Sequence, residues 1–327
     1  MSVPDLQVGS NLGPNLGPRV VSLGGGHGLA ASLSALKHLT ANLTAVVTVA
    51  DNGGSSGRLR SELGTLPPGD LRMALTALCS DNEWGRTWAD VLQHRFTSGG
   101  GLHDHAVGNL LIVALWDLLG DHVGGLDLVG RLLGAQGRVL PMSAVPLDIE
   151  ADVRMFDAPE KLTCVRGQAE VASVEGGDVV SVRLEPADPP ACPEAIEAID
   201  AAEWVVIGPG SWFTSVIPNL LVPGIRTALH RTSARRILVL NLGEQVGETA
   251  GFSPADHLDV IAAHAPELGI DYVLADTSAL DAEGNLEAAA KALGAELVTA
   301  KVASAPGAKT HDSVRLTAAL RQIIESA

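Results

Sequence analysis

Val46–Arg60 reads VVTVADNGGSSGRLR, and this stretch is the strongest indication of the fold in the sequence. It begins as a nearly all-apolar, β-branched run, which is typical of a parallel strand covered on both faces. The run stops at Asp51, and a loop of glycines, serines and Arg58 follows. Glycines let backbone N–H groups converge on an anion, hydroxyls add donors, and arginine supplies a fixed positive fork. The stretch therefore predicts a strand and an anion-binding loop, although a plain turn with Asp51 as the cap of the next helix fits the same residues.

A similar strand and loop come earlier in the chain. Arg19–Leu23 is the first predicted strand, and the loop GGGHG follows it at Gly24–Gly28. Leucines at helical spacing lead from this loop into the second strand, so these elements form a βαβ unit with a right-handed crossover. GHGLAA, starting at Gly26, fits the dinucleotide pattern G-x-G-x-x-A, with Asp51 where a ribose-binding acid belongs. A glycine turn needed only for close strand–helix packing fits the pattern as well.

Strands and helices alternate along most of the remaining chain. Strands are predicted at Trp204–Ile207, Ile237–Leu240, Tyr272–Ala275 and Glu296–Val298. Helices are predicted at Leu71–Leu78, Trp84–Phe96, Leu110–Leu119, Glu194–Ala201, Ser215–Leu221, Ile225–His230, Ala255–His264, Leu286–Leu293 and Val314–Ile324. This alternation predicts an α/β fold with a mostly parallel sheet and helices on both faces.

The chain divides into a tail and one domain. Residues 1–18 are rich in Gly, Pro, Asn and Ser, which predicts a flexible tail before a single domain at 19–327. Within that domain, residues 137–190 carry short β-type runs among Asp, Gly and Pro, and we interpret them as a small β-rich insertion. The part from 276 to 327 follows the alternation least closely.

Composition narrows the classes of partner. Hydrophobic residues make up 46% of the 327 residues and charged residues 18%, which indicates a large core. The net charge of −16 disfavours nucleic acid or an anionic membrane as a partner, so an anionic ligand must be met by local Arg and N–H groups. Three scattered cysteines, no secretory signal and no apolar segment long enough to span a bilayer predict a cytoplasmic protein.

Several common site classes lack support. The tract His103-Asp104-His105 has no further ligands at zinc spacing. Gly210-Ser211 lacks the G-x-S-x-G elbow of serine hydrolases, and the chain has no G-x-x-x-x-G-K-[ST] phosphate loop. Polar or glycine-rich loops instead follow the strands that start at Arg19, Leu43, Trp204 and Arg236. Because parallel strands end at one edge, these loops are predicted to form one ligand site.

The ordered motifs resemble a known family. They are SLGGGHGL, TVADNGGSSGRLR, LPPGDLRMAL, HAVGNL, GRVLPM, VIGPGSWFTSVIPNLL and GETAGFSPADH. Together they resemble the gluconeogenesis factor family (YvcK-type), related to the 2-phospho-L-lactate transferases (CofD-like), from about Val20 to His264. The resemblance implies a Rossmann-like three-layer (αβα) fold, a cytoplasmic location and a nucleotide-diphosphate ligand, usually a UDP-sugar. It also implies a role in cell shape or envelope growth on gluconeogenic carbon.

Three positions depart from the family pattern. Where the family has GGGTG, this chain has His27 in place of Thr, and where the family has ADDGG, it has Asn52 in place of the second Asp. Asn52 still accepts a hydrogen bond, but it supplies no negative charge to a divalent metal. The family's GHSLGN keeps His105, Gly108 and Asn109 here but loses its serine.

Motif and loop positions together give the predicted site. The residues predicted to bind the ligand are Gly24, Gly25, Gly26, His27, Gly28, Asp51, Asn52, Gly53, Gly54, Ser55, Ser56, Gly57, Arg58, Asp70, Arg72, His105, Gly108, Asn109, Gly208, Pro209, Gly210, Ser211, Thr214, Ser215, Asn219 and Asn241. The glycine loops at Gly24–Gly28 and Gly53–Gly57 are expected to cradle the diphosphate, and Arg58 is expected to pair with its charge.

Three functions are consistent with these residues. The first is a ligand-sensing protein that binds a UDP-sugar without turnover, because an acidic metal ligand is lost at Asn52. The second is a CofD-like transferase that uses Mg²⁺, with Asp51 and Asp70 as its carboxylates and Asp51 on the metal. The third, NAD-dependent oxidoreduction, rests only on the dinucleotide pattern. We also expect a homodimer, and a signalling partner that the sequence does not identify.

Overall fold

Seven parallel strands form the central sheet of the computed structural model, which describes residues 16–245 and 247–326. They are β1 (Val20–Gly24), β2 (Leu43–Val47), β3 (Arg138–Pro141), β7 (Trp204–Ile207), β8 (Arg235–Val239), β9 (Tyr272–Asp276) and β10 (Glu296–Ala300). Their order across the sheet is β10-β9-β8-β7-β1-β2-β3. Every residue of β1 and β7 is buried, as continuous apolar runs in a doubly covered sheet should be. The predicted Rossmann-like, mostly parallel fold is confirmed.

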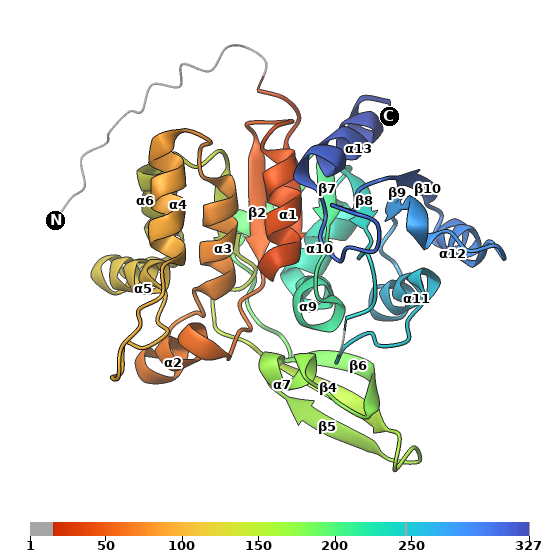
Figure 1. Cartoon of the computed structure of the whole chain (residues 1–327), viewed down its shortest axis with the longest axis horizontal. Helices are drawn as coiled ribbons and strands as arrows, with labels where there is room; N and C mark the ends of the chain where they lie inside the picture. The colour runs from red at the N-terminus through yellow and green to blue at the C-terminus, as the bar shows by residue number, and fades with distance from the viewer. Residues whose placement is uncertain (1–15, 246, 327) are drawn as a thin grey trace.

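Helices cover both faces of this sheet. The main ones are α1 (Gly26–Leu36), α2 (Gly54–Leu63), α3 (Gly69–Leu78), α4 (Glu83–Gln93), α5 (Val107–Leu119), α6 (His122–Leu133), α8 (Pro193–Ala201), α9 (Ile217–Leu221), α10 (Pro223–Arg231), α11 (Pro254–His264), α12 (Asn285–Ala292) and α13 (Ser313–Ser326). α1 packs against α3 and α13 in front of the sheet (Figure 1). The chain steps in opposite directions from β1 to β2 and from β7 to β8. Right-handed crossovers therefore place α1 and α10 on opposite faces.

The order of strands reverses between β1 and β7. From β1 the chain builds the sheet toward β2 and β3, and from β7 it builds toward β8, β9 and β10. β1 pairs with β2 on one side and with β7 on the other, so the loops after β1 and β7 leave the sheet side by side. Open α/β sheets bind their ligands outside the carboxyl ends of the strands at such a point.

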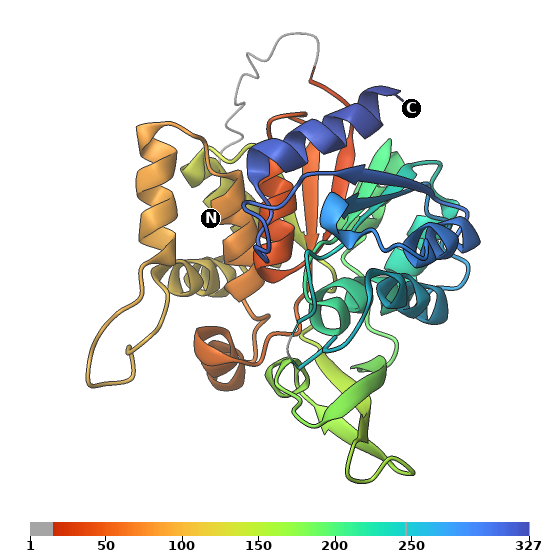
Figure 2. The same ribbon diagram turned by 45° about the vertical axis from the view of Figure 1, so that its right-hand side comes forward.

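A small antiparallel sheet projects below the central one (Figures 1 and 2). Its order is β5 (Leu162–Arg166), β4 (Asp148–Met155) and β6 (Gly177–Glu185), and the short helix α7 (Gln168–Ala172) lies between β5 and β6 along the chain. The insertion predicted at 137–190 needs one correction. Its first β-type run is β3, which pairs with β2 in the central sheet because its side chains are apolar and buried from Val139 onward.

The predicted tail lies mostly outside the described residues. Of residues 1–18, only 16–18 are described, and they pack against the turn before β2. Ala41 N donates to Leu16 O at 2.9 Å, and Thr40 Oγ1 donates to Pro18 O at 2.6 Å. Within residues 16–245 and 247–326, no helix has the length and apolar character needed to cross a membrane.

Candidate functional site

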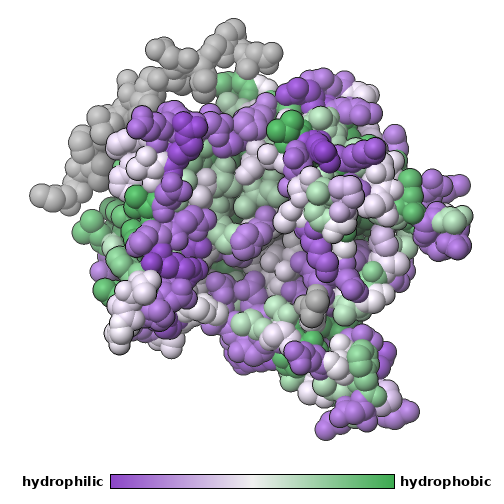
Figure 3. Space-filling model, viewed as in Figure 1, coloured by the Kyte–Doolittle hydropathy of each residue, from purple (hydrophilic) through white to green (hydrophobic). Residues whose placement is uncertain are grey.

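A cleft of about 830 Å³ opens where β1, β7 and β8 end. Its size lies within the range of small-molecule sites. It is lined by Gly25, Gly26, His27, Gly28, Ala30, Ala31, Ser34, Pro209, Gly210, Ser211, Ser215, Asn241, Leu242, Gly243, Glu244, Gln245, Lys309, Thr310, His311 and Ser313. In the space-filling view, pale and apolar surface occupies the middle of this face between hydrophilic ridges (Figure 3). Because the cleft lies at the ends of the neighbouring strands β1 and β7, it stands where the strand order reverses.

The start of α1 forms one wall of the cleft. Gly25 is the residue before the helix, and no side chain caps the helix there. The helix dipole favours an anion at this point, and the N–H of Gly26 already donates to the Asp70 carboxylate. Gly28 in the first turn touches the loop after β7: a Cβ on it would lie 2.3 Å from both Gly210 Cα and Pro209 O. Only glycine lets these two loops approach so closely.

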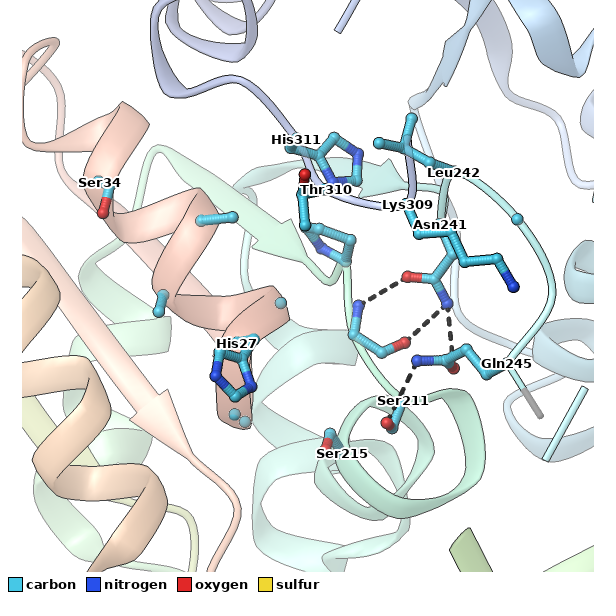
Figure 4. A pocket seen from close by; sticks show the side chains of 18 of the residues that line it. His27, Ser34, Ser211, Ser215, Asn241, Leu242, Gln245, Lys309, Thr310 and His311 are labelled. Carbon is cyan, nitrogen blue, oxygen red and sulfur yellow. Dashed lines mark hydrogen bonds between the residues drawn. The ribbon is translucent and has the colours of Figure 1, made fainter. Parts of the chain in front are cut away.

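Asn241 fixes the loop after β7 from the opposite side (Figure 4). Its Oδ1 accepts from Gly210 N at 2.9 Å, and its Nδ2 donates to Gly210 O at 2.8 Å. Gln245 extends the network: its Nε2 donates to Ser211 Oγ at 3.2 Å, and its Oε1 accepts from Trp212 N at 3.2 Å. The side-chain amide of Asn241 thus holds both polar groups of one glycine, which sets the shape of the cleft wall.

A buried carboxylate supports the same loop from behind. Trp212–Val216 forms a π-helical turn before α9, and Glu248 lies against it with 4% of its surface exposed. The Glu248 carboxylate accepts from Thr214 Oγ1 at 2.6 Å and from Phe213 N at 2.9 Å. Burial raises the pKa of Glu248, while these hydrogen bonds oppose the rise. π-helical turns are rare and are frequent at functional sites.

The positive charge of the cleft comes from the C-terminal part of the chain. Lys309 is the only Lys or Arg among the lining residues in the described chain, and its Nζ donates to Glu244 O at 3.1 Å. Thr310 and His311 lie beside it (Figure 4). Burial lowers the pKa of His311, which favours its neutral form. With a net charge of −16 on the whole chain, this lysine is a local exception suited to an anionic ligand.

Asp70 lies beside the start of α1, next to a second carboxylate. A Cβ on Gly25 would come within 2.5 Å of Asp70 Oδ2, and Gly26 N–H donates to the Asp70 carboxylate. Burial, and then the negative charge of Asp51, raise the pKa of Asp70 to about 7, against the opposing effects of Gly26 N–H and Arg72. Asp70 is therefore a carboxyl group whose charge changes near neutral pH.

Asp70→Asn is expected to remove a pH-dependent loss of stability. Because the pKa of Asp70 is raised in the folded protein, ionisation of this residue destabilises the fold progressively as pH rises from about 4 to about 7, and constantly above that. The variant should therefore melt at a higher temperature than the wild type at pH 8, and the two should converge toward pH 4.5. Thermal unfolding at both pH values checks this, and a gap that widens on acidification would contradict it.

Several predicted residues form a second cluster away from the cleft. Ser55 Oγ lies 3.0 Å from His105 Nδ1 and accepts from Asn109 Nδ2 at 3.0 Å. Arg72 packs on Gly108. Asp51 is close enough to Asp70 and Arg72 for its charge to act on both, and its Oδ1 accepts from Gly53 N at 2.9 Å. The predicted site residues thus divide into a cleft group and a group at the start of α2, α3 and α5.

Four other predicted residues are engaged with protein partners. Asn52 holds α7, since its Nδ2 donates to Glu170 and its Oδ1 accepts from Ala169 N. The guanidinium of Arg58 donates to Gly101 O and His103 O, at 3.3 and 2.7 Å, and does not line the cleft. Thr214 donates to Glu248, and Asn219 Nδ2 donates to Thr48 Oγ1 and Ser215 O. Arg58 thus holds the loop before α5 in this structure, and its pairing with the diphosphate stays a prediction.

The remaining predicted glycines shape the loops. Gly24 and Gly208 follow or end strands with positive φ values of 156° and 74°. Gly53, Gly54 and Gly57 open α2, where a Cβ on Gly57 would lie 1.9 Å from Asn52 O. These residues set backbone geometry and lie outside the cleft lining.

Sequence reasoning missed the far wall of the cleft. Cleft residues outside the list of predicted site residues are Ala30, Ala31, Ser34, Leu242, Gly243, Glu244, Gln245, Lys309, Thr310, His311 and Ser313. Of these, Leu242, Gly243 and Glu244 belong to the loop that was predicted to contribute to the site after the strand starting at Arg236. The polar loop that starts at Asn241 was a usable signal, because it follows a predicted strand. The segment Lys309-Thr310-His311-Asp312 follows the family only loosely, and Lys309 was not assigned to the site because its neighbours in the cleft are far away in the sequence.

Comparisons with known proteins agree with this architecture. The family model for the 2-phospho-L-lactate transferase CofD matches residues 20–311. A putative gluconeogenesis factor of Mycobacterium leprae is 53% identical over 313 residues, which are 94% of this chain and 87% of the relative. A gluconeogenesis factor of Halalkalibacterium halodurans is 41% identical over 255 residues, covering 78% of this chain and 76% of the relative.

Solved structures give the same result. Two crystal structures of a Bacillus halodurans protein match with TM-scores of 0.82 and 0.81. Each is 35% identical in sequence and covers 93% of this chain and 99% of the other, and one is described as a member of the UPF0052 family. The match to the family model, which extends to residue 311, includes the segment that carries Lys309.

Proposed function

Since the chain belongs to the gluconeogenesis factor (UPF0052) family, which is related to the 2-phospho-L-lactate transferases, we propose that it binds a nucleotide diphosphate sugar as a regulatory signal. The ligand class is a UDP-sugar, bound in the cleft at the ends of β1, β7 and β8. The signal controls cell shape and envelope growth on gluconeogenic carbon. Binding without turnover is the favoured mode.

One observation carries the proposal of a nucleotide diphosphate ligand. The glycine loops after β1 and β7 meet at the reversal of strand order, and the start of α1 lines a cavity of suitable size. The diphosphate would accept hydrogen bonds from the backbone N–H groups of His27 and Gly28, since Gly26 N–H donates to Asp70, and Lys309 would supply positive charge. Asn241 and Gln245 already bond to the protein, so their role is to hold the loop that contacts the ligand.

Isothermal titration calorimetry tests the ligand class. Folded protein is titrated with UDP-N-acetylglucosamine, UDP, GDP and NAD in separate runs. Binding of the UDP compounds, and not of NAD, is the expected result. Absence of heat with every nucleotide, from protein shown to be folded by circular dichroism, would rule the proposal out.

Lys309→Met is expected to weaken UDP-sugar binding about tenfold, because a charge-assisted contact to phosphate contributes roughly 1.5 kcal/mol or more. The methionine keeps the apolar stem and removes the charge. Lys291→Met, on the exposed face of α12, is the matched control and should bind as the wild type does. The affinity measured by calorimetry decides: equal affinities for Lys309→Met and Lys291→Met would place the phosphates elsewhere.

A second candidate function rests on the two neighbouring carboxylates. Asp51 is close enough to Asp70 for its charge to raise the pKa of Asp70, and a divalent cation would relieve that repulsion. Within the described residues, no group of three His, Cys, Asp or Glu side chains could hold a metal ion, so ligand phosphates would have to complete a Mg²⁺ site. The cation would neutralise phosphate charge in a CofD-like transfer.

Magnesium-dependent turnover separates the two candidates. The protein is incubated with a nucleotide-activated phospholactate and a deazaflavin alcohol, with and without Mg²⁺. Product that is lost in an Asp51→Asn variant with normal nucleotide affinity would favour the transferase. No product with any divalent cation would leave ligand sensing as the function.

A further inference from the structure

Arg72 is a buried cation without a hydrogen-bond partner. Its side chain is 4% exposed, and both Nε and Nη1 are buried and unpartnered among the described residues. Burial lowers the pKa of Arg72, as expected for a guanidinium removed from water. Buried charges are normally paired, because an unpaired one is costly. The charges of Asp70 and Asp51 offset part of this cost, but they do so without a hydrogen bond to the guanidinium.

The protein makes room for this side chain. A Cβ on Gly108 would lie 2.9 Å from Arg72 Cγ and Cδ and 2.9 Å from Leu92 Cδ2. Gly108 is in the first turn of α5, so the glycine lets the start of that helix rest directly on the arginine stem. The motif GN at Gly108-Asn109 is thus explained by the passage of Arg72 across the helix start.

Two helix starts meet close to the Arg72 side chain, because Gly108 of α5 rests on its stem and α5 contacts α2. α2 has ten residues and α5 has thirteen, and neither has a side-chain cap. They are joined at their first turns, because Ser55 Oγ accepts from Asn109 Nδ2 at 3.0 Å and Ala106 N lies 3.4 Å from Ser55 Oγ. The Oδ1 of Asn109 is buried and unpartnered as well. That oxygen is an acceptor and binds no anion, so the attraction for an anion comes from Arg72 and from the two positive dipole ends joined beside its stem.

Carboxylates close to Arg72 do not neutralise it directly. Asp70 and Asp51 are within electrostatic range on one side, and Arg95 is on the other, but none of their groups forms a hydrogen bond with the Arg72 guanidinium. Arg95 is already engaged, since its Nη1 donates to Asp104 O at 2.8 Å. The Nδ1 of His105 lies 3.0 Å from Ser55 Oγ in the same cluster, and burial and the charge of Arg58 lower the pKa of His105. The two buried nitrogens of Arg72 are left for a ligand.

We propose that Arg72, with the starts of α2 and α5, binds a small oxyanion, the phosphate or carboxylate group of a second ligand. None of Arg72, Ser55, His105 and Asn109 lines the nucleotide cleft. Asp70 stands between the two sites, bonded to Gly26 on the cleft side and near Arg72 on the other. The protein therefore has two anion sites that share one carboxylate neighbour.

Arg72→Met tests the site by thermal unfolding without any nucleotide. Inorganic phosphate and sodium acetate are added separately at constant ionic strength set with NaCl. One or both anions should raise the melting temperature of the wild type by about 2–4 °C at concentrations roughly tenfold above the dissociation constant. Arg72→Met should lose at least two thirds of that rise. Response to phosphate alone assigns a phosphate ligand, and response to acetate alone assigns a carboxylate.

The melting temperature of Arg72→Met without added anion is an independent test. Because an unpaired buried charge is removed, Arg72→Met without anion should melt at or above the wild-type temperature. If Arg72 were only a structural residue paired electrostatically with Asp70 and Asp51, the same variant would melt lower or fail to fold, and either result would overturn the proposal. The proposal would also be overturned if neither anion raised the melting temperature of the wild type, or if the anions raised the melting temperatures of the wild type and the variant equally.

Two control variants separate this site from the cleft. Arg86→Met, on the exposed face of α4, should keep the full anion response. Lys309→Met should also keep most of it while losing UDP-sugar affinity, and Arg72→Met should bind the UDP-sugar within about threefold of the wild type. Since the anion response is measured without nucleotide, failure of the proposed UDP-sugar binding would leave it unaffected, and loss of the anion response in Lys309→Met would assign the anion to the cleft instead.

Discussion

Gly28→Ala should destabilise the protein by about 3 kcal/mol or more and abolish the cleft. The added Cβ would lie 2.3 Å from Pro209 O and Gly210 Cα and 2.6 Å from Gly210 N. All three are backbone atoms, and the loop that carries them is fixed by Asn241, so the clash has to move α1 away from the loop after β7. Overpacking of this kind typically costs 1–3 kcal/mol, and more where the neighbour is rigid.

Urea unfolding of Gly28→Ala and a matched glycine variant measures the effect. Gly99→Ala is the control, because nothing lies within 4 Å of its added Cβ and its backbone is not in the left-handed region. That variant should unfold within about 0.5 kcal/mol of the wild type. Similar urea midpoints for the two variants would show that the contact between the loops after β1 and β7 is looser than 2.3 Å implies.

Asn241→Asp should lower UDP-sugar affinity by roughly two orders of magnitude. The Nδ2 that donates to Gly210 O at 2.8 Å would be replaced by a carboxylate oxygen, so two acceptors would face each other. Losing a hydrogen bond and leaving a polar group opposed costs about 1–3 kcal/mol. The new negative charge also lies in the cleft wall, where it repels a diphosphate. The sum corresponds to about a hundredfold loss.

A charge-matched variant controls for the added carboxylate. Asn285→Asp, exposed at the start of α12, changes the net charge by the same amount outside the cleft and should bind with wild-type affinity. Circular dichroism confirms folding of both proteins before calorimetry. If Asn241→Asp retained its affinity, the loop that starts at Gly208 would not contact the nucleotide.

Runs of apolar residues predicted the central sheet well. Trp204–Ile207 was predicted with its observed bounds because four successive buried residues leave only a doubly covered strand. β4 was not predicted, since Ile149, Ala151 and Val153 alternate with charged residues and face a small, one-sided sheet. α2 was interpreted as a loop, because it starts inside the serine-rich and glycine-rich segment at Gly54. Its helical conformation depends on tertiary contacts that local propensity does not contain.

The parts of the candidate site that directly follow a strand were predictable, whereas contacts between segments distant in the sequence were not. The glycine loop at Gly24–Gly28 and the loop at Gly208 each follow a strand, and the sequence alone placed them at one edge. The carbonyl partners of Arg58 and the approach of Lys309 depend on loops that are distant along the chain. Such partners have no periodic or compositional signal, so the contacts of Arg58 with the loop before α5 could not be predicted. α6 was also absent from the prediction.

The position of β1 in the middle of the sheet has a consequence for protein synthesis. Val20 pairs with Trp204, so the strand made first waits for its second neighbour until most of the chain has left the ribosome. At 5–20 residues per second this interval is roughly 10–40 s. During that time β1 has an apolar, unpaired edge, the kind of surface that chaperones bind and that aggregates. Slow translation of the middle of the gene would lengthen this exposure, and circular permutation that begins the chain at β7 would shorten it.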